Sequence, residues 1–198
     1  MAAEGTFVLK IIWLDVETTG LDRIRNGIIQ IAGIVDVDGE PVESFDFSMN
    51  PAKEIDAGAE AIHGISSEEI AGYPSSEETY RAFTALLDRY VDAALQQTRL
   101  KPGGYNVSFD LGFLDQWFLE VGGKSIYAYL TDDTVDPSAM MKAYQGYLGK
   151  KRLPSWGLRG VASQLGVELG RNHDALEDIR FTRELHRRLL SFFDPAVG

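Results

Sequence analysis

The chain has 198 residues, of which 44% are hydrophobic and 25% charged, and it contains no cysteine. This composition is typical of a globular protein and excludes disordered and collagen-like chains. The lack of cysteine excludes disulfide scaffolds, cysteine-ligated zinc sites and thiol nucleophiles. The net charge of −11 argues against a nucleic-acid-binding surface, but residues 150–188 carry nine basic and five acidic side chains. This pattern fits either an ordinary solvated surface or an acidic metal site with phosphate-binding residues beside it.

Membrane insertion and secretion are not expected. No apolar run reaches the roughly 18 residues of a membrane-spanning helix. The first ten residues, MAAEGTFVLK, lack the basic start and long apolar core of a signal peptide. We therefore expect a cytoplasmic protein with no membrane partner.

Three strands are predicted at the start of the chain. Residues 7–14 are apolar and β-branched, which indicates a buried strand. Residues 27–37 and 41–49 indicate a second and a third strand, joined by the hairpin signal Asp38-Gly39. We therefore expect a three-stranded meander.

Helices alternate with two short strands in the rest of the chain. Residues 50–76 are rich in turn-forming residues and predict an irregular connection, and Ser75 or Ser76 can cap a helix over 77–95. The further predicted elements are a strand near 99–105, a helix after Phe109, a strand over 126–131, and helices over 137–148, 155–165 and 173–192. This order of elements predicts one α/β domain over residues 6–193.

Two carboxylates end the first predicted strand, in the string IIWLDVETTG. Asp15 and Glu17 are two positions apart, so on a strand their side chains point the same way. At the end of a buried run such charges repel each other and lose hydration unless a cation neutralises them. The alternative interpretation is a strand that simply ends in a polar turn.

The last predicted helix carries an acid on its apolar stripe. Ala175, Asp178, Thr182, Leu185 and Leu189 are spaced so that they share one helix face. Acids on a core-facing stripe are rare unless they are paired or bind a metal. Asp178 is therefore predicted to be either a metal ligand or one partner of a buried ion pair with an arginine.

Asp110 and His173 indicate a functional site only when they are considered together with the other three acids. Alone, Asp110 fits a helix first turn and His173 fits a helix cap. Together with Asp15, Glu17 and Asp178, they form a set of four carboxylates and one histidine at the ends of core elements. Oxygen ligands of this kind suit Mg²⁺ or Mn²⁺, and two such ions about 4 Å apart serve phosphoryl transfer.

Three motifs jointly resemble those of the DEDD exonucleases whose general base is histidine. This family includes the proofreading subunit of bacterial replicative DNA polymerase and ribonuclease T. The motifs are DVETTG, N-x-x-F-D from Asn106 to Asp110, and H-x-A-x-x-D from His173 to Asp178. The segment AIHGISSEEI around His63 is also similar to an H-G-I segment of the family. The resemblance extends from about residue 11 to residue 190.

The resemblance implies a ribonuclease-H-like α/β fold, with a mixed five-stranded sheet flanked by helices and a second strand antiparallel to the rest. It also implies 3′→5′ hydrolysis of single-stranded DNA or RNA ends to nucleoside monophosphates, with two Mg²⁺ or Mn²⁺ ions as cofactors. Carried over residue by residue, it implies Asp15, Glu17, Asp110 and Asp178 as metal ligands, His173 as general base, and Thr18, Thr19, His63 and Asn106 as substrate contacts.

One stretch departs from the family pattern, and three points stay open. Pro102-Gly103-Gly104-Tyr105 stands where the family has a plain apolar strand, so an irregular approach to Asp110 is expected. DNA is the favoured substrate, but an RNA-trimming enzyme resembling ribonuclease T is an alternative. A non-catalytic accessory of the same fold is another alternative, although the complete acid and histidine set argues against it. A polymerase or another replication protein is the partner that the resemblance suggests.

Overall fold

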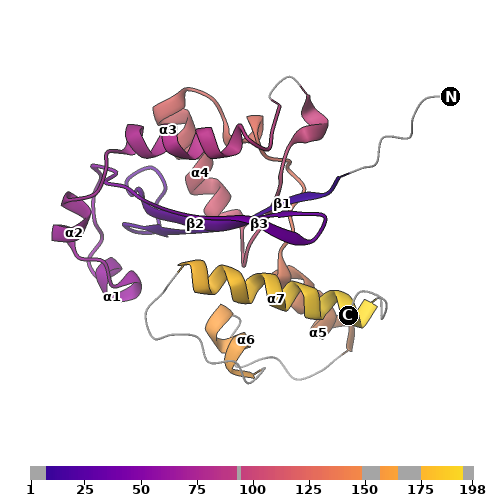
Figure 1. The fold of residues 1–198 in the computed structure, drawn as a ribbon. Coiled ribbons are helices and arrows are strands. Elements are labelled where there is room, and N and C mark those ends of the chain that lie inside the picture. Colours follow the sequence, from indigo (N-terminus) through magenta and orange to yellow (C-terminus); the bar gives the residue numbers. More distant parts are fainter. Residues whose placement is uncertain (1–7, 93–94, 149–156, 165–174, 194–198) are drawn as a thin grey trace.

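A mixed sheet with strand order β3-β2-β1-β4 lies at the centre of the computed structural model, which describes residues 8–92, 95–148, 157–164 and 175–193 (Figure 1). Strand β2 runs antiparallel to both of its neighbours, and β4 runs parallel to β1. The strands are β1 (Lys10–Thr18), β2 (Ile28–Val37), β3 (Glu40–Ser48) and β4 (Lys101–Gly103). The predicted meander is therefore present.

Helices cover both faces of this sheet, with α3 and α4 on one side and α5, α6 and α7 on the other (Figure 1). The α-helices are α1 (Ala59–His63), α2 (Ser67–Ala71), α3 (Ser76–Leu87), α4 (Ser108–Gly122), α5 (Pro137–Leu148), α6 (Leu158–Gln164) and α7 (Ala175–Phe193). Short 3₁₀ helices occupy Gln96–Thr98 and Ile126–Ala128. No helix in these described ranges is long and apolar enough to span a membrane.

The two faces of β1 contribute to two different cores, because successive side chains of a strand point to opposite sides. Ile12, Leu14 and Val16 belong to the core that includes residues of α3 and α4. Ile11 and Trp13 pack instead in a cluster with Ile179 of α7 and Ile34 of β2. Burial on both faces explains why the strand is apolar at nearly every position before Asp15.

The connection after β3 contains more helix than the sequence predicts. Residues 50–76 include α1 and α2, so the prediction of a wholly irregular connection is wrong. A capping box at Ser66, in which Glu69 donates its backbone N–H to the serine hydroxyl and its carboxylate accepts from the serine N–H, starts α2. The predicted cap Ser75 starts α3 in the same way, but this helix ends at Leu87 and does not reach residue 95.

The expected fifth strand over 126–131 is wrong for the described residues, where two isolated bridges replace it. Leu100 pairs with Leu130, and Gly103 pairs with Val135. Between these bridges Pro102 has no N–H to donate, although its carbonyl accepts from Val135. The interrupted ladder leaves a four-stranded sheet in this part of the molecule.

Glycines let the short strand β4 approach β1 closely. A Cβ atom at Gly103 would lie 2.7 Å from Cε3 of Trp13, and one at Gly104 would lie 2.8 Å from the Leu14 carbonyl. Only glycine fits such close contacts without displacing the core. The irregular approach expected from Pro102-Gly103-Gly104-Tyr105 is therefore present.

A buried carboxylate ties α7 to the sheet. Asp36 of β2 is 4% exposed, and its Oδ2 accepts a hydrogen bond from Trp13 Nε1 at 3.0 Å and from Arg183 Nε at 2.6 Å. The ion pair with Arg183 fixes α7, and with it Asp178, against β1 and β2.

We expect Asp36→Ala to lower the free energy of unfolding by about 3 kcal/mol, because it leaves a largely buried guanidinium and an indole N–H without their acceptor. Urea denaturation measures this change. Asp46→Ala is the matched control, since Asp46 is exposed and bonds only Gln30 among its described partners. Equal effects of the two variants would contradict the anchoring role of Asp36.

Candidate active site

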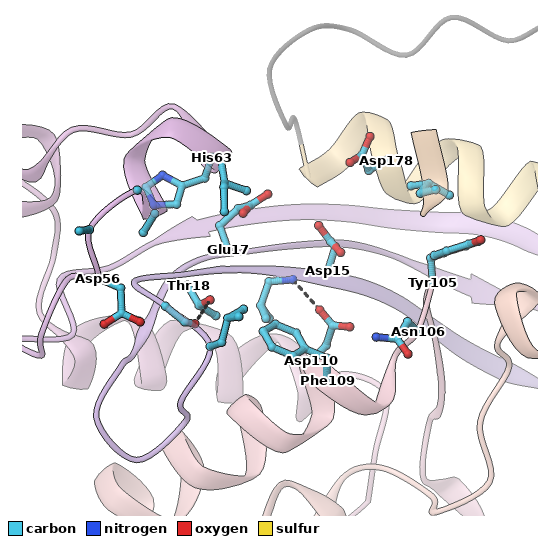
Figure 2. A pocket seen from close by; sticks show the side chains of 18 residues that line it. Asp15, Glu17, Thr18, Asp56, His63, Tyr105, Asn106, Phe109, Asp110 and Asp178 are labelled. Carbon is cyan, nitrogen blue, oxygen red and sulfur yellow. Dashed lines mark hydrogen bonds between the residues drawn. The ribbon is translucent and has the colours of Figure 1, made fainter. Parts of the chain in front are cut away.

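A cavity of about 510 Å³ lies at the C-terminal end of β1 and collects side chains from distant parts of the sequence. Its walls come from β1 and the following loop, the segment before and within α1, the start of α4, and α6 and α7. Figure 2 shows the four acids of the predicted set facing this space from three elements. The lining residues include Asp15, Glu17, Thr18, Leu21, Asp56, Ile62, His63, Tyr105, Asn106, Phe109, Asp110, Leu158 and Asp178.

Strand β1 supplies two of the acids. Asp15 pairs with Ala32 and Glu17 with Gln30 of β2, so both belong to a regular antiparallel ladder until a register shift after Glu17. They continue the face of β1 that begins with Trp13 and is covered by α7. The prediction that the two carboxylates point the same way is consistent with this register. Asp15 is partly buried and Glu17 is buried.

Asp110 reaches the site from the first turn of α4. Its Oδ1 accepts a hydrogen bond from the Val16 N–H at 3.0 Å, and the side chain is 3% exposed (Figure 2). The pairing of β4 with β1 ends at Trp13 and Gly103. Beyond this point the Asp110 carboxylate takes the place of a strand carbonyl and accepts the hydrogen bond from the edge of β1. This bond fixes Asp110 next to Asp15 and Glu17.

A left-handed turn at Asn106 directs the chain into α4. Asn106 has φ of 61°, a conformation that asparagine tolerates better than most residues. Its backbone N–H donates to Oδ1 of Asp136 at 3.1 Å. Asn106 also lines the cavity, so the residue predicted to contact substrate shapes the backbone that carries Asp110.

Asp178 lies on α7, 5% exposed, and completes the set. Its Oδ1 is 3.5 Å from an Nη atom of Arg159 on α6. The sequence left open whether Asp178 faces a metal site or pairs with an arginine. The structure places it in both settings, since the same carboxylate lines the cavity and has a guanidinium beside it.

The acids raise one another's pKa. Burial raises the pKa of Asp15 well above its ordinary value, and the charges of Asp110, Glu17 and Asp178 raise it further. Burial and the Asp178 charge raise the pKa of Glu17 to about 7, against a lowering by Arg159. Burial also raises the pKa of Asp110 to about 8, although hydrogen bonds from backbone N–H groups oppose this. Near neutral pH these groups therefore resist full ionisation without a cation.

The donor set fits a hard divalent cation in its chemistry. Carboxylate oxygens are the ligands that Mg²⁺ and Mn²⁺ prefer, and a cation would relieve the repulsion among the acids. Within the described ranges, however, no three His, Asp or Glu side chains already surround one metal position.

His63 enters the cavity from α1 with a defined tautomer. It is 5% exposed, and its Nδ1 accepts a hydrogen bond from the Ile65 N–H at 3.0 Å. Because Nδ1 is the acceptor, the proton of the neutral ring lies on Nε2. His63 thus lines the cavity, while its Nε2 atom is buried.

The two threonines of DVETTG differ in their positions. Thr18 lines the cavity and donates its hydroxyl hydrogen to the Gly20 carbonyl at 2.7 Å (Figure 2). Thr19 is fully buried, and its hydroxyl accepts from the Gly27 N–H at 3.0 Å. The structure thus uses Thr19 to close the loop between β1 and β2 and places only Thr18 at the cavity.

The predicted general base, His173, lies outside the described residues. Several lining residues were not singled out from the sequence, among them Asp56, Tyr105 and Leu158. Arg159, beside Asp178, was also missed. Each of these residues reaches the cavity through the packing of its element against distant parts of the chain.

We expect the metal-free protein to lose thermal stability as the pH rises from about 5 to about 8.5. The folded state binds protons on Glu17 and Asp110 more tightly than the unfolded chain, so stability is fully present below the unfolded pKa values and falls as the pH passes the raised ones. Melting curves in EDTA measure this slope.

Asp110→Asn should flatten this slope, whereas Asp46→Asn, which removes one exposed acid, should leave it unchanged. A wild-type melting temperature that stays level or rises over this pH range would contradict the mutual repulsion of the site acids.

Comparison with known proteins agrees with this geometry. Residues 12–185 match the family model for RNase T, described as an exonuclease family. This match covers most of the chain and all three motifs, and it confirms the resemblance to DEDD exonucleases. Membership of the histidine subclass stays a prediction.

Two relatives are the PolC-type DNA polymerase III proteins of Thermotoga petrophila and Staphylococcus saprophyticus. The first is 29% identical over 186 residues, and the second is 28% identical over 185 residues. These alignments cover 94% and 93% of this chain but only 12% and 11% of the polymerases. The chain therefore corresponds to a small part of each relative.

Solved structures of exonuclease I have the same fold. The zinc-bound complex of Escherichia coli exonuclease I with single-stranded DNA superposes with a TM-score of 0.76 at 21% identity, over 96% of this chain and 42% of that one. Exonuclease I of Methylocaldum szegediense gives a TM-score of 0.72 at 20% identity, over 96% and 42%. The predicted ribonuclease-H-like architecture is confirmed, with four strands in place of five among the described residues. The chain belongs to the RNase T exonuclease family, and its three motifs are of the DEDD type.

Proposed function

We propose that this chain hydrolyses single-stranded nucleic acid from its 3′ end, with DNA as the favoured substrate, and releases nucleoside monophosphates by a two-metal mechanism. The observation that carries this proposal is the meeting of four desolvated carboxylates, from β1, α4 and α7, in one cavity. A cluster of this kind is costly unless it binds cations. We therefore infer that the domain holds these four carboxylates in place to bind divalent metal ions.

The proposed ligands of two Mg²⁺ or Mn²⁺ ions are Asp15, Glu17, Asp110 and Asp178. When bound, such ions supply Lewis acidity and an activated water for phosphodiester hydrolysis. Asp110 is held by the Val16 N–H and Asp178 by the packing of α7, so both carboxylates are held in place before a metal binds. Pre-positioned ligands reduce the reorganisation that catalysis would otherwise need.

We assign the removal of a proton from the attacking water to His173. This residue comes two positions before α7, whose first turn carries Asp178. An imidazole has an ordinary pKa near neutrality and can therefore accept a proton at physiological pH. The role rests on the H-x-A-x-x-D motif and on this place in the chain.

The cavity suits a terminal nucleotide in size and lining. Pockets for small ligands have volumes of about 300–1,000 Å³, and this one combines apolar side chains with a few polar groups. Leu21, Ile62 and Phe109 offer surfaces for a base and a sugar, while His63 and Thr18 offer polar contacts. Asn106 stands at the opposite wall, near Asp110 (Figure 2).

DNA is favoured because the relatives are DNA polymerases and because exonuclease I has been solved with single-stranded DNA. A polymerase or another replication protein is the proposed partner, on the same grounds. A cytoplasmic place of action belongs to this proposal.

The direct test uses 5′-labelled single-stranded DNA and RNA of the same sequence, with Mg²⁺, Mn²⁺ or EDTA. We expect a ladder of products that shorten from the 3′ end, release of nucleoside monophosphates, faster cleavage of DNA and no cleavage in EDTA. Faster cleavage of RNA would point to an RNA-trimming enzyme. Binding without cleavage in every metal would point to a non-catalytic accessory.

Asp15→Asn should lower the cleavage rate by about a thousandfold or more, since loss of a metal ligand removes several kcal/mol of transition-state stabilisation. Single-turnover cleavage of labelled DNA measures this loss. Asp46→Asn is the control, because it removes one exposed acid on β3 and should leave the rate unchanged. A rate for Asp15→Asn within tenfold of wild type would argue against the proposed metal site.

His173→Ala should slow single-turnover cleavage by roughly 10²–10⁴-fold, the usual contribution of a general base. Its Mn²⁺ affinity should stay close to that of wild type, because the imidazole acts on the water and is not a metal ligand. Calorimetry on the metal-free variant provides this second measurement. Near-normal cleavage with a lowered melting temperature would make His173 a helix cap instead.

A further inference from the structure

An arginine lies within the carboxylate cluster. Arg159 on α6 has an Nη atom 3.5 Å from Oδ1 of Asp178. The carboxylate is 8% exposed and the guanidinium 31% exposed, so this pair is shielded from solvent on the acid's side. Arg159 also lowers the pKa of Glu17. The positive charge of Arg159 therefore interacts with Asp178 of α7 and with Glu17 of β1.

This contact differs from the other ion pairs that the described part of the chain contains. The Asp36–Arg183 pair anchors α7 to the sheet. Each of the remaining pairs includes at least one exposed side chain, as between Arg188 and Glu184. Of the four site acids, Asp178 is the one with such a pair in the described ranges. The guanidinium of Arg159 therefore lies beside a carboxylate that is also a proposed metal ligand.

We propose that Arg159 is the counter-cation of the metal-free site and competes with the divalent ions for Asp178. This inference rests on the proposed function, because it assumes that Asp178 binds a metal. In the metal-free protein, Arg159 offsets part of the repulsion among the acids. When metal binds, the ion and the guanidinium interact with the same carboxylate, so each lowers the affinity of Asp178 for the other.

Charge balance favours competition over cooperation. Four ionised carboxylates carry four negative charges, which two divalent ions neutralise completely. A guanidinium beside Asp178 is then a surplus positive charge, and its repulsion from the metal acts across a poorly hydrated carboxylate, where electrostatic interactions are stronger than in water. The position of Arg159 therefore lowers the affinity for metal while it stabilises the metal-free fold.

Arg159→Gln tests this competition without relying on enzyme activity. Mn²⁺ is titrated by calorimetry into metal-free protein in the absence of nucleic acid, and melting temperatures are recorded with and without Mn²⁺. We expect Arg159→Gln to bind Mn²⁺ with an apparent Kd roughly threefold to thirtyfold lower than wild type, as removal of one nearby charge in a medium of intermediate dielectric predicts. Its melting temperature in EDTA should be lower than that of wild type.

Two further variants separate competition from a general effect of charge. Arg188→Gln removes an exposed arginine of α7 and should leave the Kd for Mn²⁺ unchanged. Arg159→Lys keeps the charge but loses the planar fork, and its Kd should lie between those of wild type and Arg159→Gln. If Arg159→Gln does not fold, the comparison of Arg159→Lys with wild type decides the question.

Failure of this inference can be distinguished from failure of the proposed function. If wild-type protein binds Mn²⁺ and Asp178→Asn abolishes that binding, the metal site stands. Equal or weaker Mn²⁺ binding by Arg159→Gln then overturns the competition alone and makes Arg159 a residue that positions Asp178. If neither wild type nor Asp178→Asn binds Mn²⁺, the metal site and the competition are both overturned.

Discussion

The alternation of side chains along β1 is the constraint on which the rest of the site depends. This strand lies between β2 and β4 with helices on both faces, so its positions from Ile11 to Leu14 are apolar on both sides. The next two positions on the face covered by α7 are Asp15 and Glu17. Because the strand is held by two neighbours and two cores, these carboxylates cannot turn away into solvent. The fold therefore keeps them near each other despite their mutual repulsion.

Two other elements add their acids to this fixed point by different means. Asp110 accepts the Val16 N–H where β4 no longer pairs with β1, so one hydrogen bond both satisfies a strand edge and places a ligand. Asp178 is placed by the packing of a whole helix, which the Asp36–Arg183 pair holds against the sheet. The four acids are thus held by three elements, and Arg159 places a positive charge beside Asp178.

Several residues that the motifs single out have structural duties as well as their proposed functional ones. The hydroxyl of Thr19 closes the loop after β1, Asn106 adopts the left-handed turn that starts α4, and His63 accepts a hydrogen bond at the end of α1. Such duties explain why a motif can mark both residues that line the cavity and residues, such as Thr19, that shape its walls. Position in a motif alone therefore does not separate the two.

Local sequence patterns are enough to predict the apolar strand before Asp15, a helix cap at Ser75 or Ser76, and the helical stripe that carries Asp178. The apolar patterns also single out Asp15, Glu17 and Asp178 without any knowledge of the fold, because carboxylates in otherwise buried runs are informative. Asp110 joins them through the combined set of acids and the family resemblance. The loss of a regular fifth strand follows from tertiary contacts instead, since the missing N–H of Pro102 matters only beside residues 129–135. The tertiary structure alone placed Asp56, Tyr105 and Arg159 at the site, because contacts between distant elements depend on packing that no local spacing encodes.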